Sequence, residues 1–310
     1  LYFGIKPIIG TLSDRLMAKI PGVAKSYPRF ESRDQYMTMD NVGEGVNFSG
    51  GFRLYGNTVF GYGDQQNKAR VVITAPGSLA RFEGNAEDLT LEREQRIFGQ
   101  EVEAKIFLGQ DSIYHPAALI NYSMAKKSLE ITKGDAGRGK TPFFSSFHQV
   151  NIQTDKIVLF FDKDSLAIGE KATPVERIRE VTFESLDFFN KSDYLRIQNI
   201  ASSHPLAIMK RMSEQLDNRI LDANSYAARL NPKFSANNIR SLLYELVEDA
   251  FIFYEQGKEE ITVRDKVFHY VSANAAQRDF DNLSFTSKSS TLNASLDVKD
   301  KSIIINGVDK

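Results

Sequence analysis

The pattern most typical of a known chemistry is the glycine-rich stretch Gly134-Asp-Ala-Gly-Arg-Gly-Lys-Thr141, which matches the phosphate-binding loop G-x-x-x-x-G-K-[ST]. In such a loop the backbone amides surround phosphates, and a helix that begins at the lysine directs its positive end toward them. The candidate nucleotide contacts would be Gly134, Gly139, Lys140 and Thr141. Residues 128–132 before the motif have the apolar alternation of a strand, as this interpretation requires.

The residues after the motif do not supply the required helix. Residues 142–153 alternate at Val150 and Ile152 and carry no apolar stripe of helical spacing. Asp162 follows an apolar run, like the magnesium-binding aspartate of nucleotide-binding proteins, but that resemblance does not replace the missing helix. We therefore interpret Gly134–Thr141 as a basic, glycine-rich β-turn and predict no cofactor.

A second candidate is an acid/base cluster made by Asp111, Tyr114 and His115. β-Rich proteins often carry glycan-cleaving carboxylates on their surface, which would give these residues a catalytic role. The alternative is ordinary turn chemistry, in which Asp111 bonds its own backbone. The four histidines, His115, His148, His204 and His269, have no metal-ligand spacing, so no metal site is predicted.

These candidates lie on or beside segments with the pattern of β-strands. In residues 101–108, Val102, Ala104, Ile106 and Leu108 fall on one face and the charged residues on the other. Similar segments recur from residue 48 to residue 188, separated by glycine-rich turns. This spacing predicts a mainly β chain, either an elongated β-solenoid or a sandwich-like stack of strands. Residues 1–47 are predicted to form a helix, from Leu12 to Ile20, and a loop.

Helical spacing replaces strand spacing after residue 188. The sequence predicts one helix after Ser203 with an apolar stripe that reaches Leu216, a second at residues 222–230 and a third at residues 235–249. Two strands follow, at residues 251–255 and 260–263. Three helices and a hairpin in this order resemble a winged-helix module, placed at residues 189–272. Short β-repeat strands are expected again from Lys266, and residues 273–310 are predicted to return to the β-region.

A winged-helix module raises the possibility of a DNA-binding regulator. Between Ser203 and Asp265 there are eight basic and ten acidic residues, and the third helix carries Arg240 against three acids. Neutralisation of DNA phosphates needs clustered Lys and Arg, so this charge balance disfavours nucleic acid as a partner. A structural or protein-binding use of the module is preferred.

Composition excludes several classes of protein. The net charge is −1, which gives no overall attraction to nucleic acid or to an anionic membrane surface. The chain has no cysteine, which excludes disulfides, thiolate zinc sites and cysteine nucleophiles. It contains no apolar run of the roughly 18 residues that a membrane helix needs.

Several short motifs together resemble an interior section of very large, functionally uncharacterised, β-repeat-rich proteins of Bacteroidota bacteria. The resemblance implies a bacterial periplasmic or cell-envelope protein, and it carries over no catalytic residues. The start at Leu1 and the final strand-like segment indicate a fragment of a longer protein. The motifs are Tyr27-Pro-Arg-Phe30, Gly50-Gly-Phe52, Asp111-Ser-Ile-Tyr-His-Pro116, Pro142-Phe-Phe-Ser-Ser-Phe-His148 and Val267-Phe-His-Tyr270.

The sequence thus predicts a non-enzymatic scaffold or interaction segment that contacts other envelope proteins or neighbouring segments of its own chain. Two alternatives remain open. One is a carbohydrate-active or glycan-binding β-domain that uses Asp111, Tyr114 and His115. The other is the DNA-binding regulator.

Overall fold

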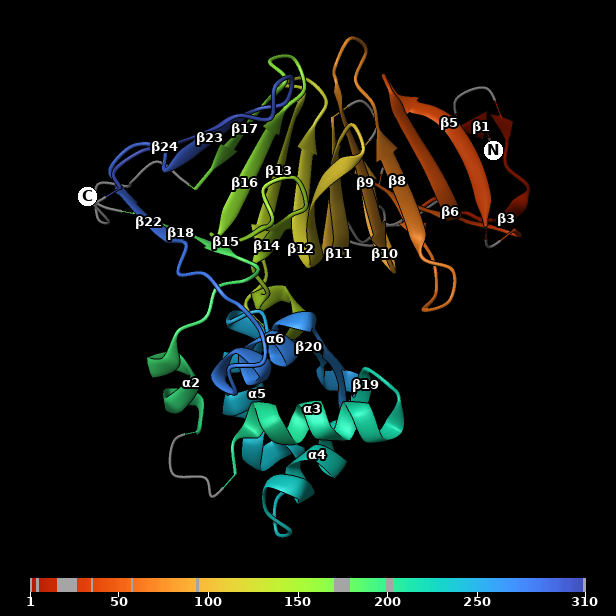
Figure 1. Cartoon of the computed structure of the whole chain (residues 1–310). Helices are drawn as coiled ribbons and strands as arrows, with labels where there is room; N and C mark the ends of the chain where they lie inside the picture. The colour runs from red at the N-terminus through yellow and green to blue at the C-terminus, as the bar shows by residue number, and fades with distance from the viewer. Residues whose placement is uncertain are drawn as a thin grey trace. The chain divides into compact units, whose positions relative to one another are not determined.

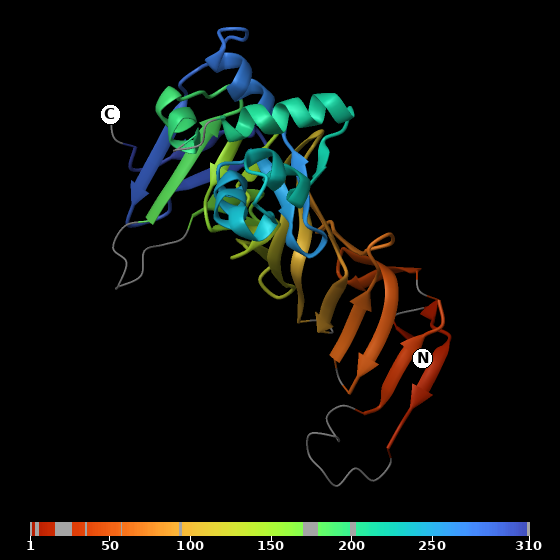
Figure 2. The ribbon, with the colours of Figure 1, turned by 90° about the horizontal axis from the view of Figure 1, so that it is seen from below.

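The computed structural model describes residues 2–3, 6–15, 27–34, 36–56, 58–92, 95–169, 179–198 and 203–308. It is mainly β, with large antiparallel sheets, as the sequence predicts. Its internal contacts divide the chain into two units, which can be followed by colour in Figures 1 and 2. We call residues 1–132, 155–180 and 288–307 the strand unit, and residues 133–154, 181–287 and 308–310 the mixed unit.

The strand unit is built from antiparallel neighbours, most of them consecutive in the chain (Figure 1). A separate two-stranded sheet joins β1 (Tyr2–Phe3) to β2 (Lys6–Pro7). The other strands are β3 (Gly10–Ser13), β4 (Arg29–Ser32), β5 (Met37–Gly43), β6 (Val46–Tyr55), β7 (Thr58–Tyr62), β8 (Ala69–Ile73), β9 (Ala80–Ala86), β10 (Asp88–Glu92), β11 (Arg96–Leu108), β12 (Asp111–Ser123), β13 (Ser128–Lys133), β16 (Lys156–Phe160), β17 (Ser165–Ile168), β23 (Ala294–Asp297) and β24 (Ile303–Ile305).

Long strands in this unit each span two shorter neighbours. On one side β6 pairs with β5 and β4, and on the other side it pairs with β8 and β7. In the same way β11 pairs with both β9 and β10. Short strands are thereby held end to end by a continuous one.

The longest pair, β11 and β12, contains two β-bulges that compensate each other. Gln100 and Glu101 together face one residue of β12, and Glu101 has a left-handed backbone with φ of 50°. One step further, Pro116 and Ala117 together face one residue of β11. Each bulge shifts the alternation by one residue, so the buried side chains stay on one face of both strands. The second bulge also accommodates a proline, which cannot donate a ladder hydrogen bond.

One face of the strand unit is therefore apolar along its width. The face predicted from residues 101–108 is confirmed, because Val102, Ala104, Ile106 and Leu108 are all buried. The same face continues across neighbouring strands through buried side chains that include Phe48, Phe52, Val71, Phe82, Ile120, Leu129, Leu159 and Leu166.

The N-terminal region differs from the predicted helix and loop. Leu12 and Ser13, where the helix was expected to begin, belong to strand β3. Residues 16–20 of that helix lie outside the described part of the chain. Strands β4 and β5 occupy the predicted loop because Arg29–Ser32 alternates exposed and buried side chains against β6. The unit boundaries also differ from those expected at residues 47, 188 and 272, since each unit gathers separate stretches of sequence.

The mixed unit holds all the helices that the structure describes, and none of them is long and apolar enough to cross a membrane. Its small sheet has the order β19-β21-β20 and is antiparallel. The elements are β14 (Phe143–Ser145), β15 (Val150–Gln153), β18 (Arg179–Ser185), α2 (Lys191–Gln198), α3 (Pro205–Leu216), β19 (Ile220–Asp222), α4 (Ala223–Leu230), α5 (Arg240–Glu248), β20 (Ile252–Glu255), β21 (Glu260–Val263), α6 (Asp265–Asn274) and β22 (Ser284–Ser289).

Local capping chemistry explains where these helices begin. The side chain of Asp222 accepts a hydrogen bond of 2.6 Å from the Ser225 N–H and caps α4. The third predicted helix starts as a 3-10 turn, Ala236–Ile239, after Ser235, and then becomes α5. On α3 the cap is His204 and not Ser203.

Two predicted details of the helical region are corrected. Leu216 is 61% exposed, because α3 ends there and the chain turns at Asp217, so its side chain does not extend the buried stripe. Residues 265–274 form α6 where short strands were expected to resume. Val267, Tyr270 and Ala273 recur at a spacing of three and are buried, which is the pattern of a helix and not of a strand.

Phe82 and Phe107 provide a test of the two faces of the strand unit. Phe82 is 0% exposed, whereas Phe107 lies on the polar face with the Arg81 guanidinium 4.2 Å from its ring centroid. We expect Phe82→Ala to lower the free energy of unfolding by about 3–5 kcal/mol, because it leaves a cavity. Phe107→Ala should cost only about 1 kcal/mol. Urea unfolding followed by the β-sheet circular dichroism signal measures both, and equal losses would contradict the assignment of faces.

His204 gives the mixed unit a pH-dependent stability. Its Nδ1 accepts the Leu206 N–H at 3.1 Å, and its Nε2 lies 2.6 Å from the Tyr194 carbonyl oxygen, so the bonded form is the neutral imidazole. Burial lowers the pKa of His204 below its ordinary value of 6.5, although the Tyr194 bond opposes this. The stabilisation is therefore present above about pH 6.5 and is lost as the pH falls toward the folded pKa.

We expect the melting temperature of the mixed unit to fall between about pH 7.5 and pH 5.5, and to fall less in His204→Asn. Asparagine can cap the helix but does not titrate. Thermal unfolding followed by the helical signal compares the two proteins. Parallel pH profiles would mean that another group causes the dependence.

Candidate functional site: the hollow between three hairpin turns

The predicted acid/base residues are not assembled into one site. Asp111 is paired with Lys301 at 2.6 Å, and the Tyr114 hydroxyl donates a hydrogen bond of 3.2 Å to Glu103. His115 is 0% exposed, and its Nδ1 accepts the N–H of Ala117 at 3.2 Å, which stabilises the bulge. Tyr114 and His115 are consecutive in β12 and point to opposite faces. The structure therefore gives each of these three residues a different partner.

The residues of the phosphate-loop motif make structural contacts within the mixed unit. Gly137–Lys140 forms a 3-10 turn, Thr141 is extended, and strand β14 follows without an α-helix. The Lys140 ammonium bonds Glu248 at 2.6 Å, and Arg138 lies 3.4 Å from Glu255. The candidate phosphate ligand Lys140 and its neighbour Arg138 are thus directed at carboxylates of α5 and β20. Gly134, Gly139 and Thr141 lie in the same turn, and Gly134 N–H donates to the Gly139 carbonyl at 3.0 Å.

The other histidines and acids do not converge. His148 Nδ1 lies 3.0 Å from the Ser145 hydroxyl, and His269 Nε2 lies 2.9 Å from the Asp187 carbonyl oxygen. Within the described ranges there is no group of three or more side chains that could hold a metal ion.

A polar hollow of about 300 Å³ lies on the outer face of the strand unit. Arg70 and Glu83 form a 2.7 Å ion pair beside it, and that hydrogen bond is the main reason that the pKa of Glu83 is lowered. Glu103 lies 3.9 Å from Lys68 and also accepts the Tyr114 hydroxyl. Because each acid has a basic or hydroxyl neighbour, the hollow has no concentrated charge of either sign.

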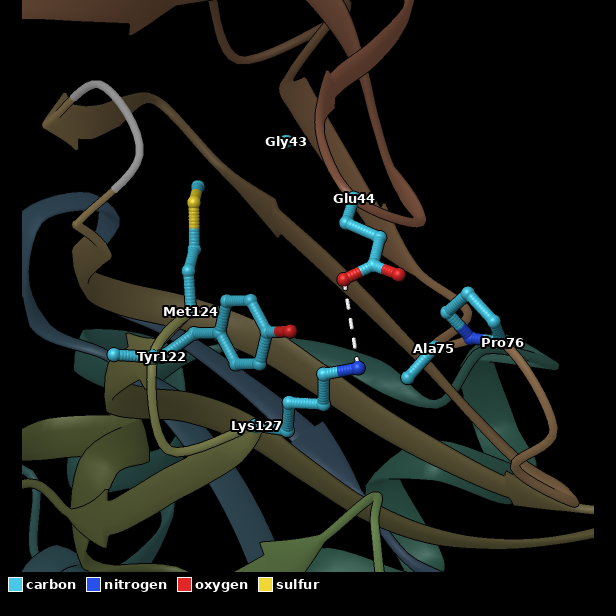
Figure 3. Close-up of a pocket in the computed structure, with 8 residues that line it drawn as sticks. Gly43, Glu44, Ala75, Pro76, Tyr122, Met124 and Lys127 are labelled. Carbon is cyan, nitrogen blue, oxygen red and sulfur yellow. Dashed lines mark ion pairs between the residues drawn. The ribbon is translucent and has the colours of Figure 1, made fainter.

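A second hollow, of about 250 Å³, lies between the turns of three hairpins in the strand unit, and we call it the turn hollow. Figure 3 draws its lining residues as sticks and labels all of them except Ala125. Its lining comes from the β5–β6, β8–β9 and β12–β13 turns. The residues are Gly43, Glu44, Ala75, Pro76, Tyr122, Met124, Ala125 and Lys127.

The polar groups of the turn hollow come from two of these turns. Lys127 Nζ and Glu44 Oε2 are 3.4 Å apart, and both side chains are substantially exposed. Tyr122 is only 2% exposed, with its ring packed edge-on against Phe161. In Figure 3 its hydroxyl points toward the Lys127–Glu44 pair. Burial and, to a smaller extent, Glu44 raise the pKa of Tyr122, so the hydroxyl is protonated at neutral pH.

Glycines allow the turns to approach each other. A Cβ on Gly43 would lie 2.8 Å from the Met124 methyl carbon, and a Cβ on Gly45 would lie 2.2 Å from the Thr74 carbonyl oxygen. Gly45 also has a φ of +71°, and its own carbonyl accepts the Thr74 N–H at 2.8 Å. The β5–β6 turn can therefore sit directly on the end of β8.

Sequence analysis missed this site because its residues are far apart in the chain. Glu44, Tyr122 and Lys127 have no motif spacing, and each lies at or near a turn. The Gly43-Glu-Gly45 segment is the one local signal, since flanking glycines indicate close backbone approach. Comparison with other proteins adds no further assignment: no family model, curated protein or solved structure matches the chain.

Gly45 and Gly77 form a matched pair for testing the turn contact. Both have positive φ, 71° and 82°, but a Cβ on Gly77 would meet no atom within 4 Å. We expect Gly77→Ala to cost about 1–2 kcal/mol from backbone strain alone. Gly45→Ala adds the clash with Thr74 and should cost about 3 kcal/mol or more. Urea unfolding measures both, and equal costs would show that the turn contact is not needed.

Proposed function

We propose that the chain is a non-enzymatic structural or interaction segment of a large bacterial cell-envelope protein. The observation that carries this proposal is the open edge of β24. The resemblance of the sequence motifs to large β-repeat proteins of Bacteroidota supports the envelope location. The engagement of Asp111, Tyr114 and His115 with separate partners favours this function over glycan cleavage.

The hydrogen-bond register defines this edge. Asn306 N–H bonds Asn293, and Asp297 N–H bonds Ser302, so Ile304 also directs its backbone groups toward β23. In an antiparallel pair the alternate residues point the other way. The N–H and C=O groups of Ile303 and Ile305 thus point away from β23, and no described strand pairs with them.

The side chains at this edge suit an added strand. Ile303 and Ile305 share a face with buried Ala294 and Leu296 but are themselves only half-buried. Ile304 is 64% exposed on the other face. An exposed, apolar edge strand is a template for pairing with another extended chain. We infer that the partner is an extended segment of another envelope protein or of a neighbouring part of the same protein.

The proposal also includes the type of strand stack and the winged-helix-like module. The antiparallel order of the strand unit supports a sandwich-like strand stack more than a coil-by-coil solenoid. In the mixed unit, the order α3, β19, α4, α5, β20, β21 supports a winged-helix-like module. We propose a docking or spacing role for it, because Arg240 on α5 already bonds Asn237 and lies 3.9 Å from Glu259. Arg240 is the one basic residue of α5, so this pairing leaves that helix without an unpaired cation for DNA phosphates.

Photo-crosslinking tests the edge in the natural full-length protein. A photo-reactive amino acid at Ile304 should give a discrete adduct in the envelope fraction. Adding Ile305→Pro should abolish it, because proline removes an outward N–H while the bonds of Ile304 to β23 remain.

The control position is Lys105, on the outer face of β11. The same adducts from both positions, or recovery of the protein outside the envelope, would count against the proposal. Salt-sensitive binding of duplex DNA would instead support the alternative function of a DNA-binding regulator.

A further inference from the structure

We propose that the turn hollow is a binding site for a neutral polyhydroxylated ligand the size of one sugar ring. The inference concerns residues other than the predicted Asp111 cluster and does not depend on the scaffold function. It rests on an accessible hydroxyl that has no partner among the described residues, an adjacent ion pair and apolar lining residues within one cavity of about 250 Å³.

The Tyr122 hydroxyl is the first reason to assign a ligand. Tyr122 is 2% exposed, yet its hydroxyl makes no hydrogen bond to any described residue and opens into the turn hollow (Figure 3). The hydroxyl is therefore accessible from the hollow to a hydrogen-bond partner. A ligand hydroxyl or water in the hollow would supply that partner.

The charges indicate a neutral ligand with several hydroxyl groups. Lys127 and Glu44 contribute one charge of each sign, 3.4 Å apart, so their sum favours neither a cation nor an anion. The ammonium donates hydrogen bonds, the carboxylate accepts them, and the phenol does both. Adjacent hydroxyl groups can satisfy all three, because each hydroxyl is both a donor and an acceptor.

The other lining residues and the volume of the turn hollow narrow the class of ligand further. Ala75, Pro76 and Met124 add apolar surface to the lining, and Figure 3 shows Met124 on one side of the Lys127–Glu44 pair and Ala75 with Pro76 on the other. Such surface can contact the C–H groups of a sugar ring. Its volume lies just below the range of about 300–1,000 Å³ that is typical of drug-sized ligands. One ring fits this description better than an oligosaccharide chain.

Methyl glucoside is a suitable probe, and the methionine methyl groups can report its binding. The chain has six methionines, and Met124 lies in the turn hollow, whereas Met209 and Met212 lie in the core of the mixed unit. In protein labelled with ¹³C at the methionine methyl groups, we expect the Met124 signal, assigned with Met124→Leu, to shift and saturate with methyl glucoside. The Met209 and Met212 signals should not move.

Tyr122→Phe tests the hydroxyl itself. It keeps the ring against Phe161, and we expect it to weaken binding about 2- to 10-fold, the effect of one hydrogen bond. Lys127→Gln should weaken binding similarly. Tyr114→Phe, which removes a hydroxyl bonded to Glu103 outside the hollow, is the matched control and should bind like the unaltered chain.

Three results would overturn the proposal. The first is a Met124 signal that does not respond to methyl glucoside. The second is a response of equal affinity in Tyr122→Phe, in which the dispersed methyl spectrum shows that the fold is intact. The third is a stronger response to glycine than to the glucoside, which would make the ion pair a zwitterion site.

Discussion

The two long strands β11 and β12 must keep their apolar side chains on one face, and most of the strand unit follows from that requirement. A shift of one residue in either strand would turn its apolar set to the opposite side. The bulge at Gln100–Glu101 and the bulge at Pro116–Ala117 shift both strands at the same level, so the buried face is continuous. β9 and β10 pair with β11 on either side of this step. The two bulges are therefore needed to keep the buried face continuous.

The same sheet geometry brings together residues that the sequence keeps apart. Hairpin turns lie at the ends of strands, so the β5–β6 and β8–β9 turns meet once Gly45 can approach Thr74. The β12–β13 turn then completes the hollow with Tyr122 and Lys127. Its polar groups are one phenol and one ion pair. These groups can donate and accept hydrogen bonds, as the proposed ligand requires.

Positive and negative charges are balanced in the whole sequence and in two of its polar regions. The whole sequence has a net charge of −1, the polar hollow pairs Arg70 with Glu83, and the glycine-rich loop pairs Lys140 with Glu248. These pairs are partly exposed, so each adds little stability, but together they leave no strong field for a phosphate or a polyanion. The proposed docking at β24 would therefore depend on backbone groups and apolar side chains more than on charge. The open edge at Ile303–Ile305 offers both.

The sequence by itself determined the mainly β character, the inward face of residues 102–108, the helix near residues 222–230 and the order of helices and hairpin in the mixed unit. These features depend on side-chain alternation and on contacts within a few residues, and such patterns can be recognised in the sequence itself. Only the tertiary structure decided the two bulges, the identity of α6 and the separate partners of Asp111, Tyr114 and Lys140. It also placed Glu44 beside Lys127, about eighty residues away in the chain. Register and turn packing depend on non-local contacts, and a single sequence does not record which strands become neighbours.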